Sequence, residues 1–196
     1  MRKINFPSYI QADAKDCGPT CLRIISKYYG KSISLQQIRN LSETTREGSS
    51  LMGLSDAAEK LGYKTLGLKI DFTTLIEDIP LPCICHWNKY HFVVIYKIDK
   101  TGKVYISDPS YGLITYSKEE FIRFWIGNNA DENTEEGVIL VLETTPSFFQ
   151  NEFDENKSKA SFSFLSKYLL KYKFLVIQLA VGLLAGSLLS LIFPFL

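Results

Sequence analysis

The sequence has few cysteines and no excess of one charge, and each of these two shortages excludes a class of protein. It also has only two histidines. The four cysteines, Cys17, Cys21, Cys83 and Cys85, form two local pairs. Each pair lies within one expected helix or strand, where disulfide geometry is poor, so a disulfide-stapled extracellular fold is excluded. The 22 basic and 21 acidic residues leave a net charge of +1. Without a basic cluster, this balance gives no footprint for nucleic acid.

A secretory signal and a zinc pattern are also missing. The N-terminal segment MRKINFPSYIQ has no apolar core, so the sequence predicts no signal peptide. The segment CICHW contains Cys83, Cys85 and His86, but its spacing matches no zinc pattern. Alternation along a strand would also place His86 on the face opposite the two cysteines. We therefore expect no metal site.

Helical periodicity in the first third of the chain gives way to strand-like alternation. Three amphipathic helices are expected, one from Cys17 to a stop at Gly30, one after Ser34 and one that ends at Gly62. Six short strands follow, interrupted by one helix; the strands are expected over 63–70, 81–87, 91–98, 103–108, 112–116 and 137–143, and the helix over 117–125. Helices followed by an antiparallel sheet predict an α+β domain over residues 1–145.

The composition changes after this domain. Residues 146–160 are polar and irregular and are expected to form a linker, and residues 161–173 mix aromatics, leucines and lysines as an interfacial helix would. Residues 174–196 form a run of 23 residues without a charge, and about 20 suffice to cross a bilayer. We expect a transmembrane helix there. Three lysines precede it, and the positive-inside rule places the N-terminal domain in the cytoplasm.

Cys17 lies at the expected start of a helix, directly after Asp16, which suits the N-cap, and before Gly18 and Pro19. Unpaired backbone N–H groups and the helix dipole lower the pKa of a thiol in such a position and favour thiolate. The alternative is that Cys17 is a small buried hydrophobe, as Cys21 on the apolar stripe is expected to be. A catalytic role for Cys17 needs a nearby base.

His91 is the better of the two candidate bases because it opens a strand that leads through a hairpin to Asp108. If Ile98 faces Lys103 across the loop, His91 and Asp108 become diagonal neighbours on one face, within hydrogen-bond reach. A shift of one residue would separate them. Taken singly, Asp108 is an ordinary turn residue and His91 a satisfied strand histidine. His86 competes for the same role but has no carboxylate at a matching offset.

These residues together supply the parts of an activated thiol. An imidazole takes the proton of the thiol, and a carboxylate orients the imidazole. Acyl transfer also needs hydrogen-bond donors for the oxyanion, and the Cys17 N–H at the start of the helix can be one. Gln11, six residues upstream, could bring its side-chain amide alongside, although by itself it is a loop glutamine.

The segments QADAKDCGPTCLRII, HWNKYHFVVIYKID and DPSYG, followed by the start of a membrane segment, resemble the N-terminal peptidase domain of peptidase-containing ABC exporters. These bacterial transporters cut double-glycine leader peptides from bacteriocins and related peptides. The resemblance covers about residues 5–145 and extends into the first membrane helix. It implies a papain-like cysteine peptidase fold, with Cys17 as nucleophile, His91 as base, Asp108 as the orienting acid and Gln11 in the oxyanion hole.

The resemblance also implies partners and a location. The implied partners are a precursor peptide with its leader, the membrane and the rest of the exporter, a homodimer when full length. No cofactor is implied for the peptidase, whereas ATP and Mg²⁺ would belong to a nucleotide-binding domain that this sequence does not contain. The implied location is the bacterial inner membrane, with the peptidase on its cytoplasmic side. One alternative is a non-catalytic peptidase-like module that only holds the substrate of an exporter. Another is a different papain-like acyl transferase, against which the membrane segment argues.

Overall fold

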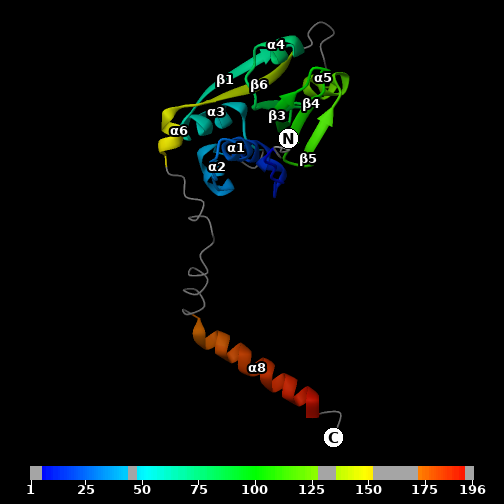
Figure 1. Ribbon diagram of the computed structural model, residues 1–196. Coiled ribbons are helices and arrows are strands. Elements are labelled where there is room, and N and C mark those ends of the chain that lie inside the picture. Colours follow the sequence, from blue (N-terminus) through cyan, green and yellow to red (C-terminus); the bar gives the residue numbers. More distant parts are fainter. Residues whose placement is uncertain (1–5, 44–47, 128–135, 152–171, 193–196) are drawn as a thin grey trace, which may run out of the picture. The chain divides into compact units, whose positions relative to one another are not determined.

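A six-stranded antiparallel sheet organises the first of the two units into which the chain divides, Met1–Glu155. The computed structural model, shown in Figure 1, describes residues 6–43, 48–127, 136–151 and 172–192. The strands are β1 (Tyr63–Ile70), β2 (Cys83–Trp87), β3 (His91–Ile98), β4 (Val104–Asp108), β5 (Gly112–Tyr116) and β6 (Gly137–Thr144). They lie in the order β1-β6-β2-β3-β4-β5, and every neighbouring pair is antiparallel. The predicted antiparallel sheet is confirmed, and all six expected strands form.

Helices pack against both faces of this sheet (Figure 1). The helices of the first unit are η1 (Ala14–Asp16), α1 (Cys17–Tyr28), α2 (Leu35–Leu41), α3 (Leu51–Lys60), α4 (Phe72–Glu77), α5 (Lys118–Ile126) and α6 (Pro146–Gln150). A first core joins the sheet to α1, α2, α3 and α6, and a second core joins it to α4 and α5. Successive side chains of a strand point to opposite faces of the sheet and so enter different cores. Ile84 and Val94 belong to the first core, and their neighbours Cys85 and Val93 belong to the second.

Serine caps fix where several helices begin. The hydroxyl of Ser34 accepts a hydrogen bond from the Gln37 N–H at the start of α2. At α5, Ser117 and Glu120 form the complete capping box that their spacing predicted, because each side chain binds the backbone N–H of the other. These caps satisfy N–H groups that have no partner inside a helix.

The β3–β4 hairpin brings together the two strand ends that carry the candidate base and acid. Near its loop, Ile98 pairs with Val104 and not, as predicted, with Lys103. A β-bulge then adds one residue to β3, and beyond it Val94 pairs with Ser107. The pairing next to the candidate site is therefore the predicted one, although the pairing at the loop is not.

The structure differs from the expected one in two places, the N-cap of α1 and the segment after β6. Asp16 occupies the N-cap position of α1, but its side chain makes no capping hydrogen bond. Both carboxylate oxygens instead bind the guanidinium of Arg39 on α2, whose forked donors match a carboxylate. Residues 146–150, expected in the linker, form α6, because Pro146 suits a first helical turn and Phe148 is fully buried in the first core. The first unit therefore extends past residue 145.

The second unit, Asn156–Leu196, contains the helix α8 (Lys173–Ile192). Within the described residues, no helix combines the length and the apolar character needed to cross a membrane. The transmembrane helix expected over 174–196 is therefore not confirmed and stays a prediction. The interfacial helix expected over 161–173 lies outside the described residues except for its last two, and so does the linker beyond residue 151.

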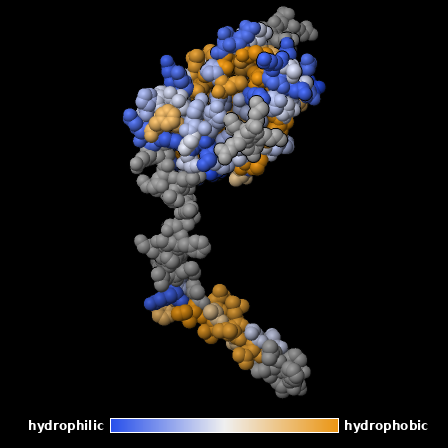
Figure 2. All heavy atoms as spheres, in the orientation of Figure 1, coloured by the Kyte–Doolittle hydropathy of each residue, from blue (hydrophilic) through white to orange (hydrophobic). Residues whose placement is uncertain are grey.

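An apolar strip remains open at the β1 edge of the sheet. In Figure 2, apolar residues gather over the part of the molecule where Figure 1 shows β1 and β6. Leu66 on β1 is 57% exposed and pairs directly with Val141 on β6. Val141 and Leu68 are partly buried against the second core. Helices thus cover the centre of the sheet more completely than this edge.

Candidate active site

A cleft of about 630 Å³ lies at the ends of β3 and β4. Its lining residues are Gln11, Asp13, Ala14, Lys15, Trp87, Asn88, Tyr90, His91, Asp108, Ser110, Tyr111, Tyr116 and Phe124. Three of the four predicted site residues, Gln11, His91 and Asp108, are among them. The fourth, Cys17, is not among the lining residues; it begins α1 two residues after Lys15 and is 4% exposed. The structure thus brings together residues from the N-terminal segment, one helix and two strands.

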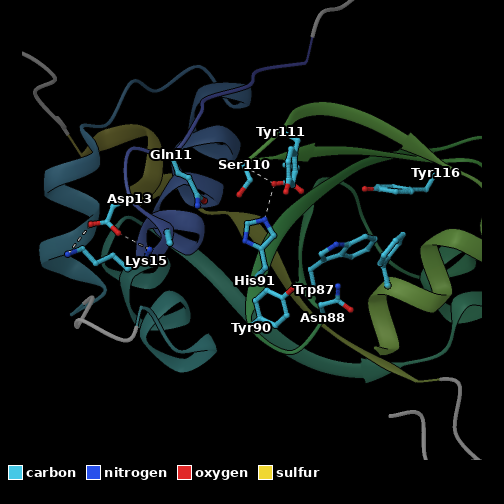
Figure 3. Close-up of a pocket in the computed structure, with 13 residues that line it drawn as sticks. Gln11, Asp13, Lys15, Trp87, Asn88, Tyr90, His91, Ser110, Tyr111 and Tyr116 are labelled. Carbon is cyan, nitrogen blue, oxygen red and sulfur yellow. Dashed lines mark hydrogen bonds and ion pairs between the residues drawn. The ribbon is translucent and has the colours of Figure 1, made fainter. Parts of the chain in front are cut away.

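His91 and Asp108 are in direct contact, as the hairpin predicted. The Nε2 atom of His91 lies 2.8 Å from Oδ1 of Asp108 (Figure 3). The backbone N–H of Ser110 donates to the same oxygen at 2.7 Å and so fixes the carboxylate. The two side chains are only 13% and 4% exposed, which strengthens their interaction. With Nε2 bound to Asp108, Nδ1 is the ring nitrogen left for a thiol.

Cys17, at the start of α1, acts together with Asp108 on the pKa of His91. Burial by itself lowers the pKa of His91. Hydrogen bonds to Asp108 and Cys17, together with the electrostatic effect of these two groups, outweigh burial and raise the pKa of His91 to about 9. The imidazole therefore holds its proton at neutral pH, which suits an ion pair with a thiolate.

Gln11 is tied to the turn after β4 through its backbone. Its N–H donates to the carbonyl oxygen of Pro109 at 2.8 Å. The side chain points toward His91 (Figure 3). Its Oε1 atom is buried, and no hydrogen-bond partner for it exists among the described residues. The side-chain amide of Gln11 therefore lies at the cleft, and among the described residues no hydrogen bond ties its oxygen to another group.

We expect the free energy of unfolding to fall between pH 6.5 and pH 9. Folding raises the pKa of His91 from 6.5 to about 9, so the folded chain holds a proton that the unfolded chain releases. The contribution of His91 by itself is complete below pH 6.5 and is lost as the pH rises through 9, by at most about 3 kcal/mol; a Cys17 thiolate, which takes up a proton on unfolding below about pH 8.5, makes the fall smaller in the lower part of this range. Urea unfolding of the whole chain under reducing conditions across this range measures it.

The matched control for this titration is the second histidine. A His91→Gln variant should show a much flatter profile between pH 6.5 and pH 9. A His86→Gln variant should retain the fall, because burial lowers the pKa of His86 and removes its titration from this range. An unchanged fall in His91→Gln would contradict the assignment.

The sequence analysis missed an aromatic cluster on the far side of His91 from Gln11. The ring centroid of Trp87 lies 5.5 Å from that of Tyr116 and 5.6 Å from that of Phe124. Figure 3 shows Trp87 and Tyr116 on one side of His91, with Gln11 on the other. Only Trp87 could have been linked to the site from the sequence. It ends β2 and pairs with His91, which opens β3, so a predicted β2–β3 hairpin places it beside the candidate base.

The remaining cysteines and His86 lie outside this cleft. Cys83 and Cys85 are fully buried in the second core, whereas His86 stacks on Phe92 of the first core with ring centroids 4.9 Å apart. The predicted separation of His86 from the two cysteines is confirmed. In the described ranges, no group of three or more His, Cys, Asp or Glu side chains is placed to hold a metal ion.

A comparison with protein families identifies the family of the chain. The model of the peptidase C39 family matches residues 5–130, which include all four predicted site residues. The chain belongs to the peptidase C39 family. This is a family of cysteine peptidases, so the C39 domain is related to hydrolases that act through a thiol.

Relatives of the C39 domain include parts of much longer proteins. The lactococcin-G-processing and transport ATP-binding protein of Lactococcus lactis subsp. lactis is 41% identical over 132 residues, 65% of this chain and 18% of that protein. The colicin V secretion/processing ATP-binding protein of Escherichia coli is 33% identical over 121 residues, 62% of this chain and 17% of that protein. The chain thus matches less than a fifth of the length of either relative.

Solved structures have the same fold. A double-glycine-motif protease from an AMS/PCAT transporter, crystallised with its leader peptide, is 30% identical with a TM-score of 0.63, covering 71% of this chain and 91% of that one. The peptidase domain of Streptococcus ComA, a bi-functional ABC transporter, is 28% identical with a TM-score of 0.62, covering 71% of this chain and 99% of that one. The predicted α+β fold is confirmed as that of C39 peptidase domains.

Proposed function

We propose that this C39 domain is a cysteine endopeptidase that removes the leader of a peptide precursor after a double-glycine-type motif. The observation that carries the proposal is the contact of His91 with Asp108 at the cleft, together with the effect of Cys17, at the start of α1, on the pKa of His91. The relatives support the substrate class, because they are named for processing bacteriocins or for cutting a double-glycine motif.

In the proposed reaction each residue has a separate task. The Cys17 thiolate attacks the carbonyl carbon of the scissile peptide bond, and the C–O π electrons move to the oxygen. The Cys17 N–H and the Gln11 amide donate hydrogen bonds to this oxyanion. When the C–N bond breaks, protonated His91 gives its proton to the leaving amine, and Asp108 keeps the imidazole oriented. Water activated by His91 then hydrolyses the thioester and releases the leader as a carboxylic acid.

The substrate class is tested with a synthetic precursor that carries a Gly-Gly leader. Cleavage by the whole chain should occur after the second glycine, as mass spectrometry of the products would record. Replacing that glycine with valine should lower kcat/KM by about 100-fold, because glycine alone lets the substrate backbone approach the site closely. Equal cleavage of both peptides, or cleavage at another position, would contradict the double-glycine specificity.

The surroundings of the domain are part of the proposal. We infer that it forms the N-terminal part of an ABC exporter, a homodimer when full length, in which residues 174–196 begin the membrane region and the peptidase faces the cytoplasm. The peptidase step needs no cofactor in this proposal, and ATP and Mg²⁺ would serve a nucleotide-binding domain elsewhere in that exporter. The names of the curated relatives, which are transport ATP-binding proteins, support this inference.

The orientation is tested by labelling in intact cells. A membrane-impermeant thiol reagent added from outside should leave Cys17 unlabelled and should reach it only after the cells are opened. Labelling of Cys17 in intact cells would place the domain on the other side of the membrane and overturn the proposed topology.

The second candidate function is a non-catalytic peptidase-like module that only binds the leader. The presence of Cys17 and its interaction with His91 favour the enzyme. The enzyme would release the precursor peptide in two pieces, whereas the binding module would release it uncut.

A further inference from the structure

A fully buried carboxylate lies directly before the proposed nucleophile. Asp16 is 0% exposed and adjoins Cys17 in the chain. A carboxylate at this point opposes the formation of a thiolate, because like charges in a poorly hydrated site disfavour one another. The mechanism proposed above makes no use of Asp16. That mechanism does need a thiolate on the adjacent residue, Cys17.

Arg39 is the cation that meets this carboxylate. Its Nε atom lies 2.7 Å from Oδ1 of Asp16, and its Nη2 atom binds Oδ2. The hydrogen bond to Asp16 raises the pKa of Arg39 above its usual value, so the guanidinium stays charged. The guanidinium is carried by α2, whose Ile38 is fully buried in the first core. The start of α1 is therefore joined to a second helix by two parallel hydrogen bonds.

The other groups around Cys17 do not replace this cation. From the sheet, His91 and Asp108 form an ion pair whose charges cancel. Cys21, on the next turn of α1, is neutral because burial raises its pKa well above the ordinary value.

Where the neighbouring elements meet the start of α1, the groups named below are paired or neutral. On the segment before α1, Asp13 and Lys15 form their own ion pair at 3.3 Å, and the charge of Asp13 also contributes to the raised pKa of Arg39. From α3, the apolar Leu54 faces Gly18, and from β2 the buried Cys85 has a raised pKa for the same reason as Cys21. Without Arg39, the charge of Asp16 would act on Cys17 without compensation.

We propose that Arg39 is a positioning residue for the peptidase reaction, which neutralises Asp16 and fixes the start of α1 so that the Cys17 thiolate forms at neutral pH. The inference rests on the proposed function for its consequence in cleavage. Its electrostatic part concerns the thiol alone and requires no substrate. A purely structural ion pair would predict equal damage from the loss of either partner, whereas a charge-balancing pair predicts opposite effects on the thiol.

The test uses Arg39→Gln, Asp16→Asn and the double variant of the whole chain. The readout is the pH dependence of Cys17 alkylation by iodoacetamide, followed by peptide mass spectrometry. The midpoint of this profile should rise by about one pH unit in Arg39→Gln and fall by about one in Asp16→Asn, as expected for a unit charge gained or lost nearby. In the double variant the midpoint should return close to that of the unaltered chain. Alkylation at pH 7 should be about tenfold slower in Arg39→Gln.

Two further variants guard against effects on folding. Lys27→Gln removes the same charge from the far end of α1, about 15 Å along the helix, and should leave the midpoint unchanged. Arg39→Lys keeps the positive charge but cannot make both hydrogen bonds of the guanidinium to Asp16. It should therefore keep the alkylation midpoint of Cys17 while kcat falls. If Arg39→Gln does not fold, an Arg39→Lys profile shifted as far as one pH unit overturns the proposal, and an unshifted profile supports it.

The result that overturns the proposal is a shift in the same direction for both single variants, or a double variant as impaired as Arg39→Gln. The proposed function fails in a different way. If the alkylation midpoints move as expected but no Gly-Gly precursor is cut, Arg39 still balances the charge at Cys17, and only the assignment of the substrate is wrong.

Discussion

Cys17→Ala is expected to abolish leader removal, with kcat/KM lowered by at least about 10⁴-fold, while the folded domain still binds the leader peptide. In the proposed reaction the Cys17 thiolate forms the covalent bond, and none of the side chains that line the cleft is a thiol that could replace it. Loss of a nucleophile in a triad leaves only the catalysis that comes from binding and from the oxyanion donors. A cleavage assay and a binding titration with one precursor peptide measure both properties.

Cys21→Ala is the matched control, because Cys21 lies one turn along the same helix and differs in its surroundings. It is 0% exposed, and burial raises the pKa of its thiol, so it has little thiolate at neutral pH. The substitution should cost on the order of 1 kcal/mol of stability and leave most activity. Cleavage by Cys17→Ala would favour another nucleophile. Alkylation of Cys21 in preference to Cys17 would reverse the assignment.

The pattern of apolar residues was sufficient to predict the sheet and the juxtaposition of His91 with Asp108. Strand alternation fixes which residues share a face, so the two side chains could be placed on one face once the hairpin was recognised. The pairing at the loop was wrong by one residue, and a bulge in β3 compensates for it. Bulges leave no clear mark in a single sequence, because the extra residue is an ordinary strand residue.

Features that depend on distant partners were the ones that sequence reasoning did not find. The short helix α4 begins at a cap in which Asp71 accepts from the Thr74 N–H, a pattern common to turns and helices alike. The helix α6 depends on burial of Phe148 against Tyr29, which follows α1, and Tyr63 on β1, both far away in the chain. The ion pair of Asp16 with Arg39 joins residues 23 positions apart. Each of these three features could be recognised only once the tertiary structure was known.

His91→Ala is expected to remove essentially all turnover, with a loss close to that of Cys17→Ala. In the proposed reaction the imidazole both accepts the thiol proton and returns it to the leaving amine, so no step would proceed without it. In the unaltered chain, activity should follow a bell-shaped pH profile. Its basic limb should lie near pH 9, because the pKa of His91 is raised to about 9 and deprotonation above it removes the general acid. The measurement is kcat/KM against pH on one leader peptide.

Asp108→Asn and His86→Ala separate orientation from proton transfer in the same assay. An asparagine in place of the carboxylate would present an amide to Nε2 and favour the wrong tautomer, so Asp108→Asn should lose up to several orders of magnitude, less than His91→Ala. It should also move the basic limb to lower pH, because the carboxylate that raises the pKa of His91 is gone. His86→Ala should stay within about tenfold, since His86 stacks on Phe92 and contacts no carboxylate in the described part of the chain. If His86→Ala were inactive while His91→Ala still turned over, the base would have to be reassigned, and the contact of His91 with Asp108 would be a structural pair at the end of the hairpin.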